Sequence, residues 1–238
     1  MELQAGGKYR IRQAVEPKDV SAAQALRQRC FGTCTDDAFD VQTQHVLIED
    51  QKCGTLVCCF RLLLLDGAHI GHSYAAQFYD LDALEKFQGP MLELGRFCIH
   101  PDWPDPDILR TAWAELTRRV DRFGVQLLFG CSSFAGVEAG RYLDAFALLR
   151  ARHLAPARWM PRVKAAQVFR FTAQQRCKPD MKKASGGMPP LLRAYLMMGG
   201  WVSDHAVIDR QMGTLHVFTG LEIGSIPPAR KRLLRALV

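Results

Sequence analysis

Two charged residues, Glu93 and Arg96, lie three positions apart inside an otherwise apolar stretch, residues 91–101. A short apolar run bounded by prolines predicts a buried strand. Charges inside such a strand cost free energy unless they are paired or used. Two interpretations are therefore open: a structural Glu–Arg ion pair, or an active-site acid or base beside an arginine that holds an anion.

The two charges can act together only if the strand is irregular. Side chains alternate along a regular strand, so Glu93 and Arg96 would point to opposite faces. One inserted residue would bring them to the same face, and Gly95 is the natural place for such a β-bulge. The active-site interpretation therefore predicts an irregularity near Gly95.

Hydrophobic patterning predicts the elements that surround this strand. Further strands are expected at residues 9–15, 43–49, 55–65, 125–131, 163–172 and 214–219, helices at 17–30, 81–87, 106–123, 141–153 and 191–198, and loops at 132–136 and 178–187. This order indicates an α/β (α+β) fold with a mixed, twisted central sheet and helices on both faces. We expect one domain over residues 1–238, with a C-terminal extension, 186–238, packed on it.

Composition narrows the class of protein. The chain has 238 residues, of which 48% are apolar, and a net charge of +7. This charge favours acidic partners such as nucleic acid, anionic lipid or an acidic carrier protein. The eight cysteines include no C-x-x-C pair, so we expect no metal site and free thiols in a reducing cytoplasm. No apolar run approaches the roughly 20 residues that span a bilayer.

Six short blocks carry a family resemblance. In chain order they are LRQRCF at 26–31, Phe39-Asp40 with HVLI at 45–48, FRLL at 60–63, ELGR at 93–96, GCSSFAG at 130–136 and PPLLRAYL at 189–196. Together they resemble the ornithine-acyl-carrier-protein N-acyltransferases of bacterial ornithine-lipid synthesis. That GNAT-like family is similar to the autoinducer (acyl-homoserine-lactone) synthases. The resemblance covers about residues 9–218.

The resemblance implies a reaction. The α-amine of an amino acid would attack the thioester of a 3-hydroxy fatty acyl group carried on acyl carrier protein. The product would be a lyso-aminolipid of membrane lipid biosynthesis, to which a partner O-acyltransferase would add a second chain. The donor would be a co-substrate, and no cofactor is expected.

The resemblance also implies roles for the charged residues. Glu93 would accept the proton of the attacking amine, with Arg96 beside it as the second catalytic residue. Arg61 and Arg96 would either hold the α-carboxylate of the amino acid or order the acidic loop that contains Asp40.

Four further residues match the family blocks. Arg27 and Arg29 would have a positioning role, with simple complementarity to a helix C-terminus as the alternative. Ser132 and Ser133 would contribute to substrate binding.

Position 44 bears on the acceptor amino acid. The ornithine family usually has an acidic residue before the histidine that aligns with His45, and this chain has Gln44. A carboxylate there would hold the side-chain amine of ornithine, whereas an amide suits a neutral side chain such as that of glutamine. Ornithine and glutamine both stay open, as does the alternative that position 44 faces solvent.

The segment after the central strand bears on the acyl donor. Residues 100–107 contain no glycine, three aspartates and three prolines. Because proline lacks an N–H and aspartate repels phosphate, this segment would bind the pyrophosphate of coenzyme A poorly. That favours acyl carrier protein, an acidic partner.

Two alternatives from other classes remain. One is an acyl-homoserine-lactone-type synthase. The other is a non-catalytic basic module that binds lipid or nucleic acid. Nucleic acid is not expected, because the arginines are spread along the chain and several lie inside strands. The tail from residue 227 is basic and apolar together, which suits either a solvated helix or contact with an anionic inner-membrane surface.

Overall fold

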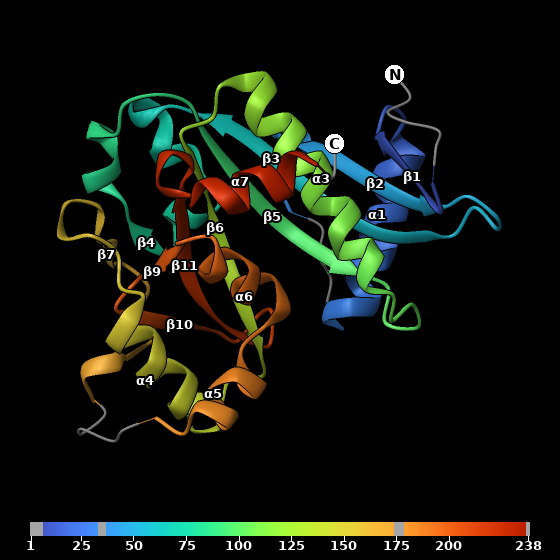
Figure 1. The fold of residues 1–238 in the computed structure, drawn as a ribbon. Helices are drawn as coiled ribbons and strands as arrows, with labels where there is room; N and C mark the ends of the chain where they lie inside the picture. Colours follow the sequence, from blue (N-terminus) through green and yellow to red (C-terminus); the bar gives the residue numbers. More distant parts are fainter. Residues whose placement is uncertain (1–6, 33–36, 174–178, 237–238) are drawn as a thin grey trace. The chain divides into compact units, whose positions relative to one another are not determined.

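The computed structural model describes residues 7–32, 37–173 and 179–236 (Figure 1). The chain divides into two compact units, each assembled from separate parts of the sequence. Unit 1 comprises residues 1–64, 92–125 and 228–238, and unit 2 comprises residues 65–91 and 126–227.

Unit 1 contains the stretch with the two charged residues. Its elements are β1 (Tyr9–Gln13), α1 (Pro17–Phe31), α2 (Phe39–Gln42), β2 (Gln44–Asp50), β3 (Leu56–Leu65), β5 (Met91–Ile99), α3 (Pro106–Phe123) and α7 (Pro228–Arg235). The strands follow the order β1-β2-β3-β5. β2 runs antiparallel to β1 and to β3, and its pairing with β3 sets His45 opposite Arg61.

Helices cover both faces of these strands. On one face, α1 packs Ala23 and Leu26 against Leu47, Cys59 and Cys98. On the other face lies α3, so that the strands run between the two helices (Figure 1). The expected α/β fold with helices on both faces of a sheet is therefore confirmed.

Both long helices of unit 1 begin where local chemistry predicts. α3 starts at Pro106, and the side chain of Asp105 accepts a hydrogen bond from the Asp107 backbone N–H at 2.8 Å. α1 starts at Pro17 with a capping box between Glu16 and Asp19. These caps satisfy N–H groups that have no partner inside a helix.

Unit 2 is built on antiparallel strands. Its elements, with short 3₁₀ turns written η, are η1 (Gly67–His72), η2 (Ala75–Gln77), β4 (Tyr79–Asp80), η3 (Asp82–Lys86), β6 (Leu127–Ala135), η4 (Ala139–Tyr142), α4 (Leu143–Arg152), η5 (Ala157–Trp159), β7 (Arg162–Val163), β8 (Val168–Arg170), η6 (Phe171–Ala173), α5 (Met181–Gly187), α6 (Pro190–Met197), β9 (Trp201–Val202), β10 (His205–Asp209), β11 (Thr214–Glu222) and η7 (Ile223–Ser225). The main order is β6-β11-β10-β8, with β9 also paired to β11, while β4 and β7 form a small separate sheet.

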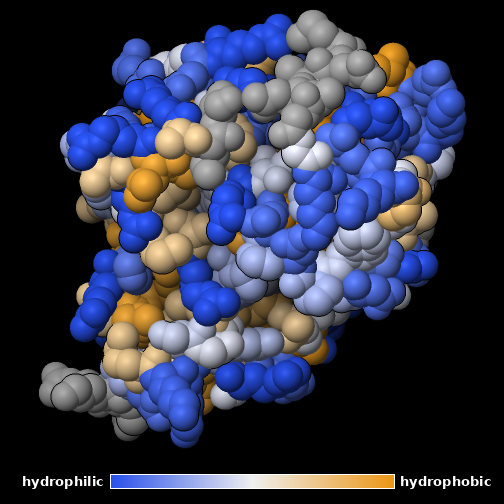
Figure 2. Space-filling view, turned by 45° about the vertical axis from the view of Figure 1, so that its right-hand side comes forward, coloured by the Kyte–Doolittle hydropathy of each residue, from blue (hydrophilic) through white to orange (hydrophobic). Residues whose placement is uncertain are grey.

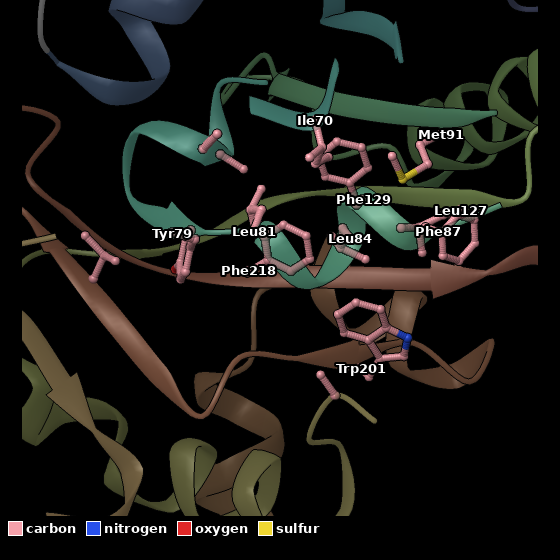
Figure 3. Packing of buried hydrophobic residues seen from close by; sticks show 14 residues of the cluster. Ile70, Tyr79, Leu81, Leu84, Phe87, Met91, Leu127, Phe129, Trp201 and Phe218 are labelled. Carbon is pink, nitrogen blue, oxygen red and sulfur yellow. The ribbon is translucent and has the colours of Figure 1, made fainter. Parts of the chain in front are cut away.

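Aromatic packing fills one core of unit 2 (Figure 3). The ring of Phe218 stacks on Phe129 at 5.7 Å and on Trp201 at 5.8 Å, measured between ring centroids. Trp201 lies directly over Gly220, where a Cβ atom would come within 2.5 Å of the indole. A glycine at position 220 is therefore a condition for this stack.

Three expectations about unit 2 are wrong. Residues 132–135 form the end of β6, not a loop, because β11 pairs with β6 through Ala135. Most of the expected loop 178–187 is helix α5, whose first N–H groups are capped by Asp180; Lys178 lies outside the described residues. The single strand expected at 163–172 is two short strands, β7 and β8, in different sheets.

The remaining features of the fold are the polarity of its surface and the state of its cysteines. Hydrophilic side chains cover much of the face seen in Figure 2. In the described part of the chain, no helix combines the length and the apolar character that crossing a bilayer requires. The six described cysteines are free thiols; Cys34 and Cys177 lie outside the described residues.

Candidate functional site

A buried group of opposite charges lies on the α1 face of unit 1. It consists of Arg27 from α1, Asp37 just before α2, Asp40 from α2, Arg61 from β3 and Arg96 from β5. We call these five residues the charge cluster. The side chains of Arg27 and Arg61 are 0% and 2% exposed. Charges buried this deeply persist only when they are paired.

Asp40 is the centre of the cluster. Its Oδ1 accepts hydrogen bonds from Arg27 Nη1 at 2.7 Å and from Arg61 Nη1 at 2.9 Å, and its Oδ2 accepts one from Gln24 Nε2 at 3.0 Å. Burial alone would raise the pKa of this carboxyl, but the hydrogen bonds from Arg27 and Gln24 outweigh it and hold the pKa below its usual range. Asp40 is therefore an anion shared by two guanidiniums.

Asp37 extends the cluster to β5. Its Oδ1 accepts from Arg61 Nη1 at 2.6 Å, and its Oδ2 accepts from Arg96 Nη2 at 2.7 Å and Nε at 3.2 Å. Burial opposes ionisation here too, but the two arginines lower the pKa of Asp37. Arg61 and Arg96 thus order the acidic segment around Asp40, which is one of the two roles the sequence left open for them.

His45 lies against the charge cluster, and the sequence analysis gave it no role. Arg27 Nη2 donates to His45 Nδ1 at 2.9 Å, and His45 Nε2 lies 3.0 Å from the backbone carbonyl of Asp40. A carbonyl only accepts, so Nε2 carries the proton and Nδ1 is the acceptor. Burial lowers the pKa of His45. The imidazole is therefore held neutral as a single tautomer. Its cross-strand pairing with Arg61 was the signal that could have identified it.

The expected irregularity near Gly95 is confirmed. Arg96 has φ 51°, the one positive φ at a non-glycine residue in the described parts of the chain. A left-handed backbone costs a non-glycine residue roughly 1–2 kcal/mol. The hydrogen bonds from the Arg96 guanidinium to Asp37 offset that strain. The sequence located this irregularity, called the bulge below, correctly but assigned the unusual backbone to Gly95 instead of Arg96.

Gly95 leaves room for the Arg61 side chain, and its direction shows which way Glu93 points. A Cβ atom at position 95 would lie 3.3 Å from Arg61 Nε and 3.5 Å from its Cγ, so the side-chain direction of Gly95 points at the charge cluster. Glu93 is two residues earlier on the same strand, so it shares that face. The side chain of Arg96 reaches the same side through Asp37. The bulge therefore brings Glu93, which is 4% exposed, and Arg96 to one face.

Two candidate residues lie outside the charge cluster but within unit 1. Arg119 Nη1 on α3 donates to Gln44 Oε1 at 2.7 Å, so Gln44 lies on the face opposite His45. Arg29 is largely exposed and has Nη1 2.8 Å from His100 Nε2. Its predicted positioning role remains a prediction, and the surroundings of the helix end fit the simpler alternative.

The remaining two candidates belong to unit 2. Ser132 is buried in β6, where its Oγ accepts a hydrogen bond from Thr219 Oγ1 at 2.9 Å. Ser133 pairs across the strands with His216. Substrate binding by these serines stays a prediction. Within the described residues, no group of three or more His, Cys, Asp or Glu side chains is placed to hold a metal ion.

Comparisons with known proteins place this geometry in context. Residues 21–114, which include the whole charge cluster, match the acetyltransferase (GNAT) domain family. The chain is 32% identical over 229 residues to the L-ornithine N(alpha)-acyltransferase of Rhodobacter capsulatus, with 88% of each chain covered. It is 28% identical over 244 residues to the enzyme of that name from Brucella abortus, with 92% of this chain and 86% of that one covered.

A solved structure shares the fold. An N-acyl amino acid synthase from uncultured soil microbes matches with a TM-score of 0.54 at 10% identity, over 91% of this chain and 92% of that one. The expected family resemblance and the GNAT-like fold are thereby confirmed.

A Gly95→Ala substitution tests the packing under the bulge. The new methyl group would press on the Arg61 side chain, which cannot move without weakening its pairs with Asp37 and Asp40. We expect the free energy of unfolding to fall by about 1–3 kcal/mol, measured by urea denaturation. The matched control is Gly71→Ala, where nothing lies within 4 Å of the added Cβ; it should change stability by less than about 0.5 kcal/mol. Equal losses of unfolding free energy in Gly95→Ala and Gly71→Ala would contradict the packing of Arg61 against Gly95.

The neutral state of His45 predicts a pH dependence. Because its folded pKa is lowered, its contribution to stability is complete above the unfolded pKa of about 6.5 and is lost as pH falls through the folded pKa. Between pH 7 and pH 5 the free energy of unfolding should therefore fall more steeply in the wild type than in His45→Gln. His153 and His205 also have lowered pKa values, but they are common to both proteins and cancel. Parallel pH profiles would show that His45 does not titrate as described.

Proposed function

The chain belongs to the L-ornithine N(alpha)-acyltransferase family, and from that membership we propose that it transfers a fatty acyl group from a thioester to the α-amine of ornithine. It is thus an acyltransferase, and the alternative of a non-catalytic binding module is set aside. The observation that carries the proposal is the bulge at Arg96, which brings a buried carboxylate and a guanidinium to one face of β5 within the GNAT match.

Glu93 is the proposed general base. The attacking amine must be neutral, so a carboxylate that accepts its proton, directly or through a water, promotes attack on the thioester carbonyl. The C–N bond forms first and gives a tetrahedral oxyanion; the C–S bond breaks as this oxyanion collapses, and the leaving thiolate takes up the proton that Glu93 accepted from the amine. The tetrahedral oxyanion needs hydrogen-bond donors, and the backbone N–H groups near residues 97–99, just after the bulge, are the candidates.

Arg96 is the proposed contact for the α-carboxylate of ornithine. The side chain of Arg96 is 10% exposed, whereas those of Arg61 and Arg27 are 2% and 0% exposed. It already binds one carboxylate, that of Asp37, through both Nη2 and Nε. Guanidinium groups pair well with carboxylates, so the greater exposure of Arg96 makes it the arginine of these three that we assign to the α-carboxylate.

The acceptor is proposed as ornithine rather than glutamine. The argument for glutamine depended on Gln44 contacting the acceptor side chain. The amide oxygen of Gln44 instead accepts a hydrogen bond from Arg119, which is also paired with Glu115 at 2.7 Å. The glutamine at position 44 is thus accounted for by a contact with α3.

The donor is proposed as an acyl group on acyl carrier protein. In coenzyme A enzymes of GNAT type, the N-terminus of the helix after the central strand grips a pyrophosphate. Here the Asp105 carboxylate occupies that place at α3, where it also accepts from Tyr9 OH at 2.6 Å and pairs with Lys8. A fixed anion at this helix start disfavours a second one. The net charge of +7 would attract an acidic carrier.

If the transferred group is a 3-hydroxy acyl chain, the product is a lyso-aminolipid of membrane lipid biosynthesis. Such a product carries one fatty chain and would be acylated again by an O-acyltransferase. An enzyme that forms it gains from working at the surface of the membrane.

The test is direct synthesis with the purified full chain. It should form N-acylornithine from 3-hydroxyacyl carrier protein and ornithine, detected by mass spectrometry. The same acyl group on coenzyme A should react at least about 10-fold more slowly, because the Asp105 carboxylate occupies the helix start where a pyrophosphate would bind. Product from glutamine but not ornithine would overturn the proposed acceptor, and no product with any amino acid would overturn the activity.

A further inference from the structure

Helix α7 has an exposed face that the acyl-transfer residues do not use. Apart from Pro228 at its first position and Arg235, which pairs with Asp121, five residues along it are exposed: Ala229, Arg230, Arg232, Leu233 and Ala236, the last one residue beyond the helix. Leu233 is 63% exposed, one of few large apolar side chains that are. We call these five residues the α7 outer face.

The opposite side of α7 is fixed to α3. Arg235 donates to both carboxylate oxygens of Asp121, at 3.0 Å from Nε and 2.8 Å from Nη2. Lys231, one turn earlier, also acts on Asp121, and together the two cations lower the pKa of this carboxyl. Lys231 and Leu234 are half-buried. The cations on the inner side of the helix therefore have a structural explanation.

The α7 outer face has a definite pattern. Ala229, Leu233 and Ala236 recur at i, i+4 and i+7, so they form one apolar ridge along the helix. At about 100° per residue, Arg230 lies on one flank of this ridge and Arg232 on the other. Neither arginine has a carboxylate partner among the residues that the structure describes. Their charges are thus available to an external anion.

We propose that the α7 outer face docks the enzyme on an anionic lipid bilayer. A helix that lies in the membrane interface inserts an apolar ridge between headgroups while flanking arginines extend to the phosphates. Leu233 would be the inserted side chain, and Arg230 and Arg232 would bind the headgroups. The ridge consists of two alanines on either side of one leucine and is flanked by two arginines, a pattern that suits the surface of an anionic bilayer. The statement that acyl transfer takes place at this membrane surface rests on the proposed function, in which the product carries a fatty chain.

Vesicle co-sedimentation of the purified full chain tests this surface. The wild type should sediment with phosphatidylcholine vesicles containing phosphatidylglycerol, and only weakly with pure phosphatidylcholine vesicles. Arg230→Glu/Arg232→Glu should weaken binding to the anionic vesicles at least about 10-fold, because each basic residue near such a surface contributes a several-fold factor. Leu233→Ser should weaken it several-fold without changing charge.

A charge-matched control separates this surface from net charge. Lys52→Glu/Arg210→Glu reverses two exposed cations elsewhere in the chain and should bind the vesicles within about 2-fold of wild type if the α7 outer face is the local contact. Wild-type protein that does not sediment with anionic vesicles, or an equal loss in both double variants, would overturn the proposal. Binding of an acidic protein, and not of lipid, by the α7 outer face would also overturn the proposal. Because sedimentation needs no substrate, failure of the acyl-transfer assay would leave this result standing.

Discussion

The arrangement of unit 1 depends on one carboxylate shared by two buried guanidiniums. Asp40 binds Arg27 from α1 and Arg61 from β3 within 2.9 Å, Gln24 donates to its Oδ2, and His45 Nε2 donates to its backbone carbonyl. Removing either sign from such a group leaves an uncompensated buried charge, which typically costs 3–5 kcal/mol. The helix, the segment around Asp40 and the sheet are therefore held in one relative position.

The unusual backbone of β5 follows from that arrangement. Asp37 carries the network from Arg61 to Arg96, and its two contacts with Arg96 offset the cost of a left-handed arginine. Gly95 leaves room for the Arg61 side chain beneath the strand. The bulge in turn decides which side Glu93 faces, and with it the chemistry that the strand can perform. Ion pairs that are largely buried thus set the geometry of the proposed base.

Much of this could be predicted because it is local. The proline and aspartate at the start of α3 follow from capping rules, and the bulge follows from a parity argument about Glu93 and Arg96. Other features depend on contacts between distant parts of the chain. The partner of Gln44 is Arg119, 75 residues away, and no spacing rule connects them. The strained residue is Arg96 rather than Gly95, and its guanidinium is held by Asp37, 59 residues away.

The most direct measurement is the rate of N-acylornithine formation by a Glu93→Gln variant, which keeps the shape of the side chain and removes its basicity. The account predicts that kcat/KM falls by roughly 10²–10⁴-fold, while a cooperative thermal transition shows that the variant is folded. Glu85→Gln, at an exposed position in unit 2, is the matched control and should keep the full rate. A Glu93→Gln enzyme that retains the wild-type rate would contradict the assignment of Glu93 as the base.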